Sequence, residues 1–373
     1  SNMERHIYRY FRFFYLFGLI LLFSTSCSAD AGEPSEPETP TTPTDEYTYL
    51  NVEYRKWQNG TFQLWTTADS RETRIIDNMN WYAPSGDYTR TAWGGRIGLQ
   101  PSSVVGKEGF FRVAYCGGRS YLLDPDNGAV IIHGIQHVRP GESTAHKKAF
   151  GTRYGSEAQW SEETGKLLAG NHINYISYGS NRIEVFPAAV RGNLLTPKTQ
   201  KIAYAENLYL LRTFMWDMSK NLGYAFDDDK YNRLVLLFEP TFATYIDRLV
   251  QEKSALFAGD RHFIGFYLDN ELPFASYQGT GYANTEGGGW LVHTQKNRGE
   301  FYQNFCLRLL ETRNCVGWVH FEYNDGYDSN GKASNKGVVS IEYEPYESFL
   351  SHMRQLNLSV HSLIDYYDTK SVQ

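Results

Sequence analysis

Polar side chains that could do acid–base chemistry end an apolar run in the segment GFYLDNELPF, residues 265–274. Asp269, Asn270 and Glu271 follow strand-like sequence, and Pro273 then prevents further ladder hydrogen bonding because it has no N–H. A glutamate at the end of a buried strand can protonate a glycosidic oxygen, and the asparagine before it can hydrogen-bond a sugar hydroxyl. The alternative is an ordinary surface acid in a loop. The pattern favours acid–base chemistry on a glycosidic bond, with Glu271 as the general acid/base.

A second carboxylate must accompany such an acid, at about 5 Å if the anomeric configuration is retained and at about 6.5–9.5 Å if it is inverted. Glu322 alternates with Phe321 at the end of a later strand-like segment, and Glu286 lies among glycines. Asp269 is a third candidate, but it should point away from Asn270 because neighbouring side chains on a strand alternate. The sequence leaves Glu322 and Glu286 open as candidate nucleophiles.

The elements that must position these residues alternate between strand-like and helix-like segments. Period and length predict buried strands over residues 129–133, 172–180, 262–269 and 315–323, and helices over residues 156–170, 239–257 and 298–314. Strands that alternate with helices indicate an α/β fold with parallel strands. Polar residues at the carboxyl ends of such strands are where a (β/α)8 TIM-like barrel carries its chemistry.

Residues 47–118 have a different texture, with short alternating runs separated by Gly, Asn and Asp. Alternation with a period of two predicts a small antiparallel β-sandwich, an accessory domain that precedes the barrel domain of residues 119–373. Ahead of it, residues 28–46 are rich in Pro, Thr and Glu and hold no large apolar side chain, which is typical of a disordered tether.

Residues 1–27 have the pattern of an export signal. Basic residues precede the apolar stretch 13–23, which is too short to span a bilayer comfortably, and small residues then lead to Cys27. This pattern resembles a bacterial lipoprotein signal, which implies lipid attachment at Cys27. Ser24 stands where that motif usually has Leu, so ordinary signal-peptidase cleavage stays an alternative. We expect an exported protein that meets a membrane only through a lipid anchor, at the outer membrane or cell surface, or one that is periplasmic or secreted.

Composition and charge exclude several classes of partner. A net charge of −6 offers no basic stripe for phosphates, so we expect no nucleic-acid partner. Cys116, Cys306 and Cys315 have no CxxC spacing and are expected to be free thiols. His133 and His137 are four positions apart in a strand-to-loop context, which does not give the metal-ligand geometry of a helix. We therefore predict no metal and no cofactor.

Four segments together resemble one known family. They are LLDPDNGAVIIHGIQHVRP (122–140), YLDNELPF (267–274), the run 287–326 that contains GWVHFEYND, and the run 335–368. Over residues 105–368 the sequence is similar to the agarase-like glycoside hydrolases around family 50, which are secreted (β/α)8-barrel enzymes that cleave galactans. The resemblance implies retaining hydrolysis of a β-linked galactan polysaccharide such as agarose or porphyran, with Glu271 as acid/base. It also implies a nucleophilic glutamate at the end of strand seven.

Further residues are expected to contact the substrate. Trp318, His320 and Asn324 lie on the segment that matches the last strand of the family, where His320 replaces a commonly found Trp, and Arg139 follows the first strand. Trp290 and Trp318 could stack on pyranose faces, and the aromatic content of 16% fits either such platforms or a large core. The expected substrate-binding residues are Arg139, His133, Asn270, Trp290, Trp318, His320 and Asn324.

The place that corresponds to the end of strand seven holds no carboxylate in this chain. Trp318 follows Glu271 by 47 positions, whereas three β/α units of a barrel would take about 90 residues. The sequence thus predicts an incomplete barrel, shortened between strands four and eight. Either the protein is a galactan hydrolase that uses another carboxylate, or it is a catalytically impaired relative that binds galactan at the cell surface without hydrolysis.

Overall fold

The computed structural model describes residues 46–58, 61–84, 88–179, 186–222, 238–269, 290–327 and 333–370. All of them belong to one compact unit, Asp45–Gln373. The predicted export signal with Cys27 and nearly all of the predicted tether lie outside the described residues, and so do Asn270, Glu271 and Glu286. Within the described ranges, no helix is long and apolar enough to cross a membrane.

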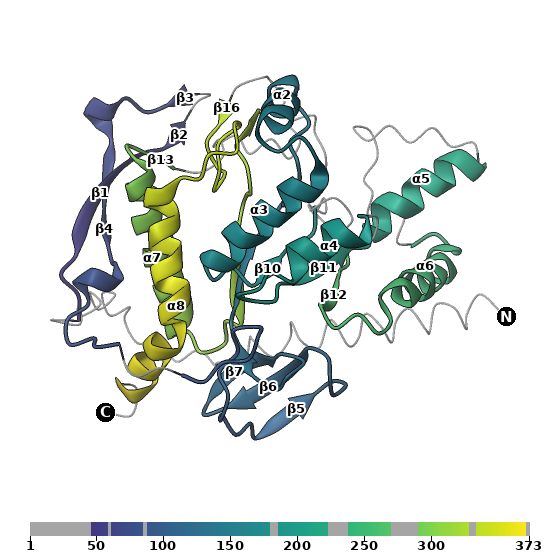
Figure 1. The fold of residues 1–373 in the computed structure, drawn as a ribbon, viewed down its shortest axis with the longest axis horizontal. Coiled ribbons are helices and arrows are strands. Elements are labelled where there is room, and N and C mark those ends of the chain that lie inside the picture. Colours follow the sequence, from purple (N-terminus) through teal and green to yellow (C-terminus); the bar gives the residue numbers. More distant parts are fainter. Residues whose placement is uncertain are drawn as a thin grey trace, which may run out of the picture. The chain divides into compact units, whose positions relative to one another are not determined.

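A five-stranded parallel sheet forms the framework of this unit (Figure 1). Its strands are, in spatial order, β12 (Phe263–Tyr267), β11 (Ala203–Asn207), β10 (Tyr175–Ile176), β9 (Ile132–Ile135) and β14 (Gly317–His320). The strands β9 to β12 follow one another along the chain with helices between them, as in repeated β/α units. The last strand, β14, pairs with the first, β9, in a register that sets His320 opposite Ile135.

In the described ranges, this order is that of a barrel wall with no parallel strand between its fourth member, β12, and its last, β14. The predicted α/β fold with parallel strands is confirmed. A closed ring of eight strands is not present in the described ranges, whose parallel sheet has five. The chain length explains the difference, because the 47 positions from Glu271 to Trp318 also contain α7 (Gln295–Glu311) and are too few for three β/α units.

Helices cover one face of the parallel sheet, where they share hydrophobic clusters with its strands (Figure 1). The helix predicted over residues 156–170 is confirmed as α3, and Ser156 caps it, because its side chain accepts a hydrogen bond from the Gln159 N–H. Gly165 lets α3 approach α4 closely, since a Cβ there would lie 2.2 Å from the carbonyl oxygen of Asn193. Besides α7, the helices are α2 (Thr144–Arg153), α3 (Glu157–Gly170), α4 (Ala188–Leu195), α5 (Leu210–Leu222), α6 (Phe242–Phe257) and α8 (Glu347–Lys370).

The opposite face of the sheet is filled near the amino ends of its strands. Ile132, Tyr175 and Ala203 cluster there with Trp93. Only glycine fits at position 134 on this face, because a Cβ would lie 2.5 Å from Cδ1 of Tyr175. Since side chains alternate along a strand, the residues on either side of these positions turn toward the helices.

Small antiparallel sheets precede the parallel sheet in the chain, as the sequence predicts. β13 comes from far down the chain, where Val292 stands opposite Tyr54 of β1. Residues of β6 and β7 share a hydrophobic cluster with α7 and α8, so the antiparallel and parallel parts have a common core. One sheet consists of β13 (Leu291–Val292), β1 (Leu50–Arg55) and β4 (Asp69–Thr73), and a second pairs β2 (Trp57–Gln58) with β3 (Thr61–Phe62). A third consists of β5 (Ser103–Val105), β6 (Arg112–Cys116), β7 (Arg119–Leu123) and β8 (Ala129–Val130). A further pair, β15 (Gly326–Tyr327) with β16 (Ala333–Ser334), follows the parallel sheet in the chain.

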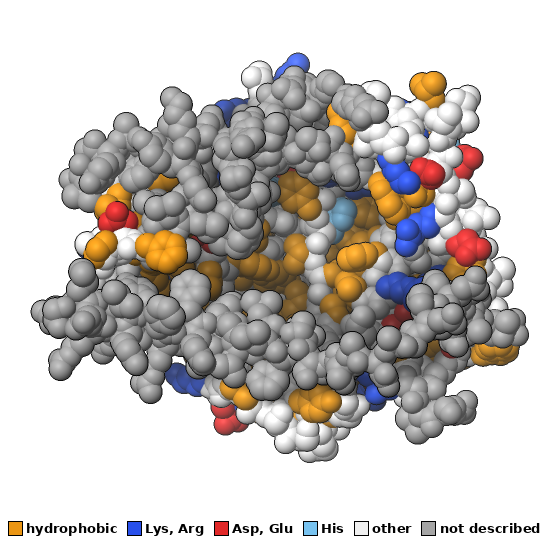
Figure 2. Space-filling model, turned by 180° about the vertical axis from the view of Figure 1, so that it is seen from behind, with side chains coloured by type: hydrophobic (Ala, Val, Ile, Leu, Met, Phe, Trp, Pro, Cys, Tyr) orange, Lys and Arg blue, Asp and Glu red, His pale blue; other side chains and the backbone are white. Residues whose placement is uncertain are grey.

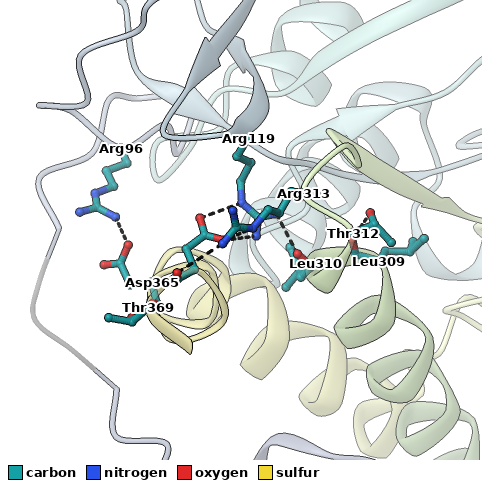
Figure 3. A network of polar contacts seen from close by, with 9 residues as sticks. Arg96, Arg119, Leu309, Leu310, Thr312, Arg313, Asp365 and Thr369 are labelled. Carbon is teal, nitrogen blue, oxygen red and sulfur yellow. Dashed lines mark hydrogen bonds and ion pairs between the residues drawn. The ribbon is translucent and has the colours of Figure 1, made fainter. Parts of the chain in front are cut away.

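Arg119 on β7 is fully buried and binds the last turns of α8 (Figure 3). Its guanidinium donates to both carboxylate oxygens of Asp368 and to the carbonyl of Leu310. Arg96 pairs with Asp365 on the same helix, at a more exposed place. The Arg119 pair fixes the end of α8 on β7, because a buried cation that loses its carboxylate is strongly destabilising.

The three cysteines in the described ranges are free thiols, as the sequence predicts. Cys306 on α7 is fully buried, and this burial raises the pKa of its thiol. Cys116 and Cys315 are half-buried and border the same hydrophobic cluster.

Replacing Asp368 with alanine should destabilise the fold strongly, because it leaves the buried Arg119 guanidinium without its carboxylate. We expect the free energy of unfolding in urea to fall by about 3 kcal/mol. Asp365→Ala is the matched control, since it removes a partly exposed ion pair from the same helix and should lower the free energy by about 1 kcal/mol or less. Equal losses in the two variants would contradict a special role for the Arg119 pair.

Candidate active site at the carboxyl edge of the parallel sheet

The carboxyl ends of the parallel strands bring polar side chains to one edge of the sheet. Glu206 and Asn207 end β11, Asp269 follows β12, His137 follows β9 and Glu322 follows β14. In α/β folds this edge is where ligands bind. Seen from behind, on the side away from α3, α4 and α8 in Figure 1, the molecule has a hollow lined mainly by hydrophobic side chains (Figure 2).

Glu322 lies at this edge and is bonded to His137. His320 stands opposite Ile135, so two residues further along Glu322 comes level with His137. The Nδ1 atom of His137 lies 2.9 Å from Oε2 of Glu322. The two side chains are 26% and 16% exposed, so a ligand can reach a carboxylate whose position is fixed. Of the two candidate nucleophiles, Glu322 is at the expected edge, whereas Glu286 lies outside the described residues.

Asp269 has a structural task. Its Oδ2 atom accepts a hydrogen bond of 2.8 Å from the backbone N–H of Leu211, and its backbone carbonyl accepts one of 3.2 Å from the Asn207 side chain. The first bond satisfies a free N–H in the first turn of α5, where a negative charge is also favourable. Asp269 thus holds α5 against the end of β12.

A cavity of about 350 Å³ lies beside this edge and reaches α6. Arg139, Glu206, Asn207 and Lys253 line it together with aromatic and aliphatic side chains. Arg139 also makes an ion pair of 3.1 Å with Glu142. Such a wall can hydrogen-bond hydroxyl groups and pack against the apolar face of a ring, which suits a sugar.

Four tyrosines cluster over the ends of β10, β11 and β12. The ring centroids of Tyr178 and Tyr267 are 4.5 Å apart, and those of Tyr178 and Tyr209 are 6.4 Å apart. The hydroxyl of Tyr175 donates to that of Tyr267 at 3.3 Å. Burial raises the pKa of Tyr175 and Tyr209, so both phenols are neutral at pH 7. The cluster offers rings and neutral hydroxyls to a ligand at the edge.

Trp318 and His320 turn away from this edge toward the helices. The indole N–H of Trp318 donates to the Tyr302 hydroxyl at 2.7 Å, and Nε2 of His320 donates to the Lys336 carbonyl at 2.9 Å. Burial lowers the pKa of His320 to about 4, so its ring is neutral at pH 7. Both residues line a second cavity, of about 440 Å³, which runs along the edge of β14 that faces away from β9.

Trp290 borders the second cavity as well, and its ring stacks on Tyr54 with centroids 4.1 Å apart. With 46% of its surface exposed, its side chain is accessible to a ligand, and the Arg71 guanidinium lies 5.3 Å from the ring centroid. Three of the expected substrate-binding residues, Trp290, Trp318 and His320, therefore lie together, but around a cavity different from the one that Arg139 lines.

His133 and Asn324 are buried and line neither of these two cavities. His133 alternates with the inward-facing Ile132 and so turns toward α8; its ring stacks on Trp318 at 5.1 Å, and Nδ1 donates to the His172 carbonyl at 3.2 Å. Asn324 is 7% exposed in the segment after β14. The structure does not bring these two residues to the sheet edge, because strand alternation and packing direct them into the interior.

Sequence reasoning missed His137, Tyr178, Tyr209 and Tyr267. Each of them lies at the end of a parallel strand or within two residues after it. Position at a strand end is the signal that could have identified these residues. The pattern used for the site is one of carboxylates, which does not include neutral side chains, and the sequence does not predict β11. His137 was set aside together with His133 as an unsuitable metal ligand.

Within the described ranges, no three His, Cys, Asp or Glu side chains come together in a way that could hold a metal ion. Among the described residues, Glu322 and His137 form a pair without a third such ligand. The arrangement at the edge is suited to proton transfer and hydrogen bonding by side chains.

The fold resembles that of solved structures. The structure of BpGH50 matches 88% of this chain and 98% of its own chain, with a TM-score of 0.68 at 18% sequence identity. The structure of an agarase, AgWH50C, matches 74% of this chain and 66% of its own, with a TM-score of 0.46 at 12% identity. An exo-beta-agarase structure matches 76% and 69%, with a TM-score of 0.42 at 10% identity. No family model and no curated protein matches the sequence. The match to BpGH50 extends over nearly all of that chain and shows a common fold.

Neutral histidines buried beside the sheet make the fold sensitive to acid. Burial lowers the pKa of His133 to about 3 and that of His361 to about 4. His172 and Arg90 border the same small cavity, so a proton there would meet other positive groups. The unfolded chain binds protons at these sites below about pH 6.5, whereas the folded protein does not. Stability is therefore complete above that pH and decreases as the pH falls toward the folded values.

Replacing His133 with glutamine should flatten this decrease. Between about pH 6.5 and pH 4, we expect the slope of the free energy of unfolding against pH to shrink by about 1.4 kcal/mol per pH unit. Urea denaturation at a series of pH values measures the slope. A His133→Gln slope equal to that of the wild type would contradict a buried neutral imidazole.

Proposed function

We propose that the protein is an exported glycoside hydrolase that acts on a β-linked galactan such as agarose or porphyran, with Glu271 as the general acid/base. The observation that carries the proposal is Glu322 at the carboxyl edge of a parallel sheet, hydrogen-bonded to His137 at 2.9 Å, in a fold that BpGH50 shares. An accessible carboxylate at this edge is what glycosidic hydrolysis requires beside its acid. The assignment of a galactan as the substrate rests on the sequence resemblance.

The roles in this proposal divide between two ends of the sheet. Glu271 follows β12 by four residues and donates a proton to the glycosidic oxygen. Glu322, after β14, is the second carboxylate. Asn270 and Arg139 hydrogen-bond sugar hydroxyls, and the tyrosine cluster stacks on a ring.

The order of the strands bears on the stereochemistry. Four steps of about 4.8 Å separate β12 from β14, which is about 19 Å along a flat sheet. The two carboxylates can meet on one glycosidic bond only across the concave face of a curved sheet. Because β12 and β14 are the two end strands of the sheet, we expect carboxylates that follow them to have the wider separation of an inverting enzyme and not the about 5 Å of a retaining one.

A second candidate function is galactan binding without hydrolysis. The observation that favours it is that the described ranges hold no parallel strand between β12 and β14, where the resembling family carries its nucleophile. A sheet with its edge residues intact could still hold a saccharide.

Glu271→Gln should reduce hydrolysis at least about a hundredfold, because it removes the proton donor. Reducing-sugar release from agarose and porphyran measures this, and affinity electrophoresis on the same galactan should show unchanged binding. Glu322→Gln should cause a comparable loss, whereas Glu252→Gln, exposed on α6, is the matched control with wild-type rates. A folded wild type that binds without turnover supports the second function; one that neither binds nor cleaves contradicts both.

The anomer formed first tests the partner carboxylate separately. Proton NMR during early turnover should show inversion if Glu322 activates the water. Retention would contradict this role and point to a carboxylate nearer Glu271, for which Glu286 is the remaining candidate.

We also propose that Cys27 carries the lipid anchor of an outer-membrane or cell-surface protein. Cys27→Ser should abolish incorporation of labelled palmitate and release the protein into the soluble fraction of expressing bacteria. Unlabelled wild-type protein cleaved near Cys27 would instead support a periplasmic or secreted form.

A further inference from the structure

His137 has a backbone conformation that few non-glycine residues adopt. Its φ is 56°, in the left-handed region, two residues after the end of β9. A residue other than glycine keeps this conformation only where its surroundings compensate for the strain, which is common at functional sites. The contacts of His137, including its hydrogen bond to Glu322, must therefore compensate for this strain.

Residues after the ends of two strands, β14 and β10, enclose the imidazole of His137. Glu322 binds Nδ1 from the end of β14, and the neighbouring Phe321 ring meets the imidazole edge-on with centroids 5.0 Å apart. From the end of β10, Gly179 lies so close that a Cβ there would be 2.3 Å from Cδ2 of His137. The φ of Gly179 is 78°, so glycine suits this place for two reasons.

We propose that His137 is the positioning residue for Glu322, an inference that rests on the proposed function. The carboxylate can only accept, so Nδ1 of His137 carries the hydrogen, and this bond fixes the rotamer of Glu322 by holding Oε2. In the proposed reaction, the other oxygen, Oε1, takes a proton from water at the sugar. Phe321 and Gly179 prevent the imidazole from turning away.

The arrangement resembles the logic of other acid–base sites, in which a third group orients the reacting one. A glutamate side chain has three rotatable bonds, and at a sheet edge it would otherwise sample several rotamers. Fixing one rotamer places the reacting oxygen before the substrate arrives, which lowers the barrier of the chemical step and leaves binding unchanged.

Two substitutions at position 137 separate positioning from packing. Asn tolerates the left-handed conformation and carries its N–H near the place of Nδ1, whereas Leu fills the volume but donates nothing. We expect His137→Leu to lower kcat about tenfold or more with KM within about twofold, and His137→Asn to recover most of kcat. A purely structural role would give equal losses in both variants, together with a lowered Tm. A kcat within about twofold of wild type in His137→Leu would overturn the proposal.

Gly179→Ala tests the same contact from the opposite side, since its methyl group would displace the imidazole. We expect a loss of kcat like that of His137→Leu. Wild-type kcat in a folded Gly179→Ala protein would contradict the enclosure of His137.

A spectroscopic readout keeps the test valid if no galactan is cleaved. In ¹⁵N-labelled wild-type protein, the His137 imidazole should show the Nδ1–H tautomer, and Glu322→Leu should shift its ring nitrogens toward those of a free histidine, while the His352 signals stay unchanged. An unaltered His137 spectrum in Glu322→Leu would overturn the positioning contact itself. Absent turnover with the expected shift would contradict the proposed hydrolysis alone.

Discussion

The parallel pairing of the last strand, β14, with the first, β9, is the interaction on which the rest of the molecule depends. It joins residues about 185 positions apart, and its register decides which side chains of β14 face the helices and which face the edge. Trp318 and His320 enter the helix-facing core, and Glu322, two residues beyond the end of β14, comes level with His137. A slip by one residue would turn Trp318 and His320 to the opposite face, because side chains alternate along a strand, and it would move Glu322 out of line with His137. The candidate chemistry is thus a consequence of one ladder.

The packing around that ladder is built to leave no other register. Position 134 must be glycine so that Tyr175 can lie across β9 on the inner face, and Trp93 fills the space next to it. On the outer face, α7 leads directly into β14 and packs along α8, and both share a cluster with β6 and β7. The antiparallel sheets therefore act as a support for the parallel sheet and not as a detached module. A buried ion pair also joins the antiparallel sheet to α8, since Arg119 on β7 binds the carboxylate of Asp368.

Much of the architecture could be predicted from sequence, because apolar runs of strand length alternate with capped helical segments; Ser156 before α3 is one such cap. β11 escaped prediction because its sequence, AYAEN, lacks a sustained apolar run. Site residues are harder to predict from sequence, since a side chain can contact a ligand only if its strand ends at the right residue. His133 and His137 look alike in the sequence, yet one lies inside β9 and is buried, while the other lies beyond its end and meets a carboxylate. No local pattern distinguishes the two; only the pairing of distant strands does.

The hydrogen bond between the hydroxyls of Tyr47 and Tyr367 joins positions 320 residues apart, near the two extremes of the compact unit. A nascent chain that emerges amino end first can form its local hairpins early, but it cannot complete the parallel sheet until β14 has been synthesised, and it cannot join Tyr47 to Tyr367 until α8 has been synthesised. Contacts of such long range slow folding, since loop closure must precede the contacts that stabilise it. The antiparallel sheets and the parallel sheet accordingly reach their final form in one late, cooperative event. A polypeptide that ends before α8 would lack the contacts of this helix with Tyr47 and with β6 and β7.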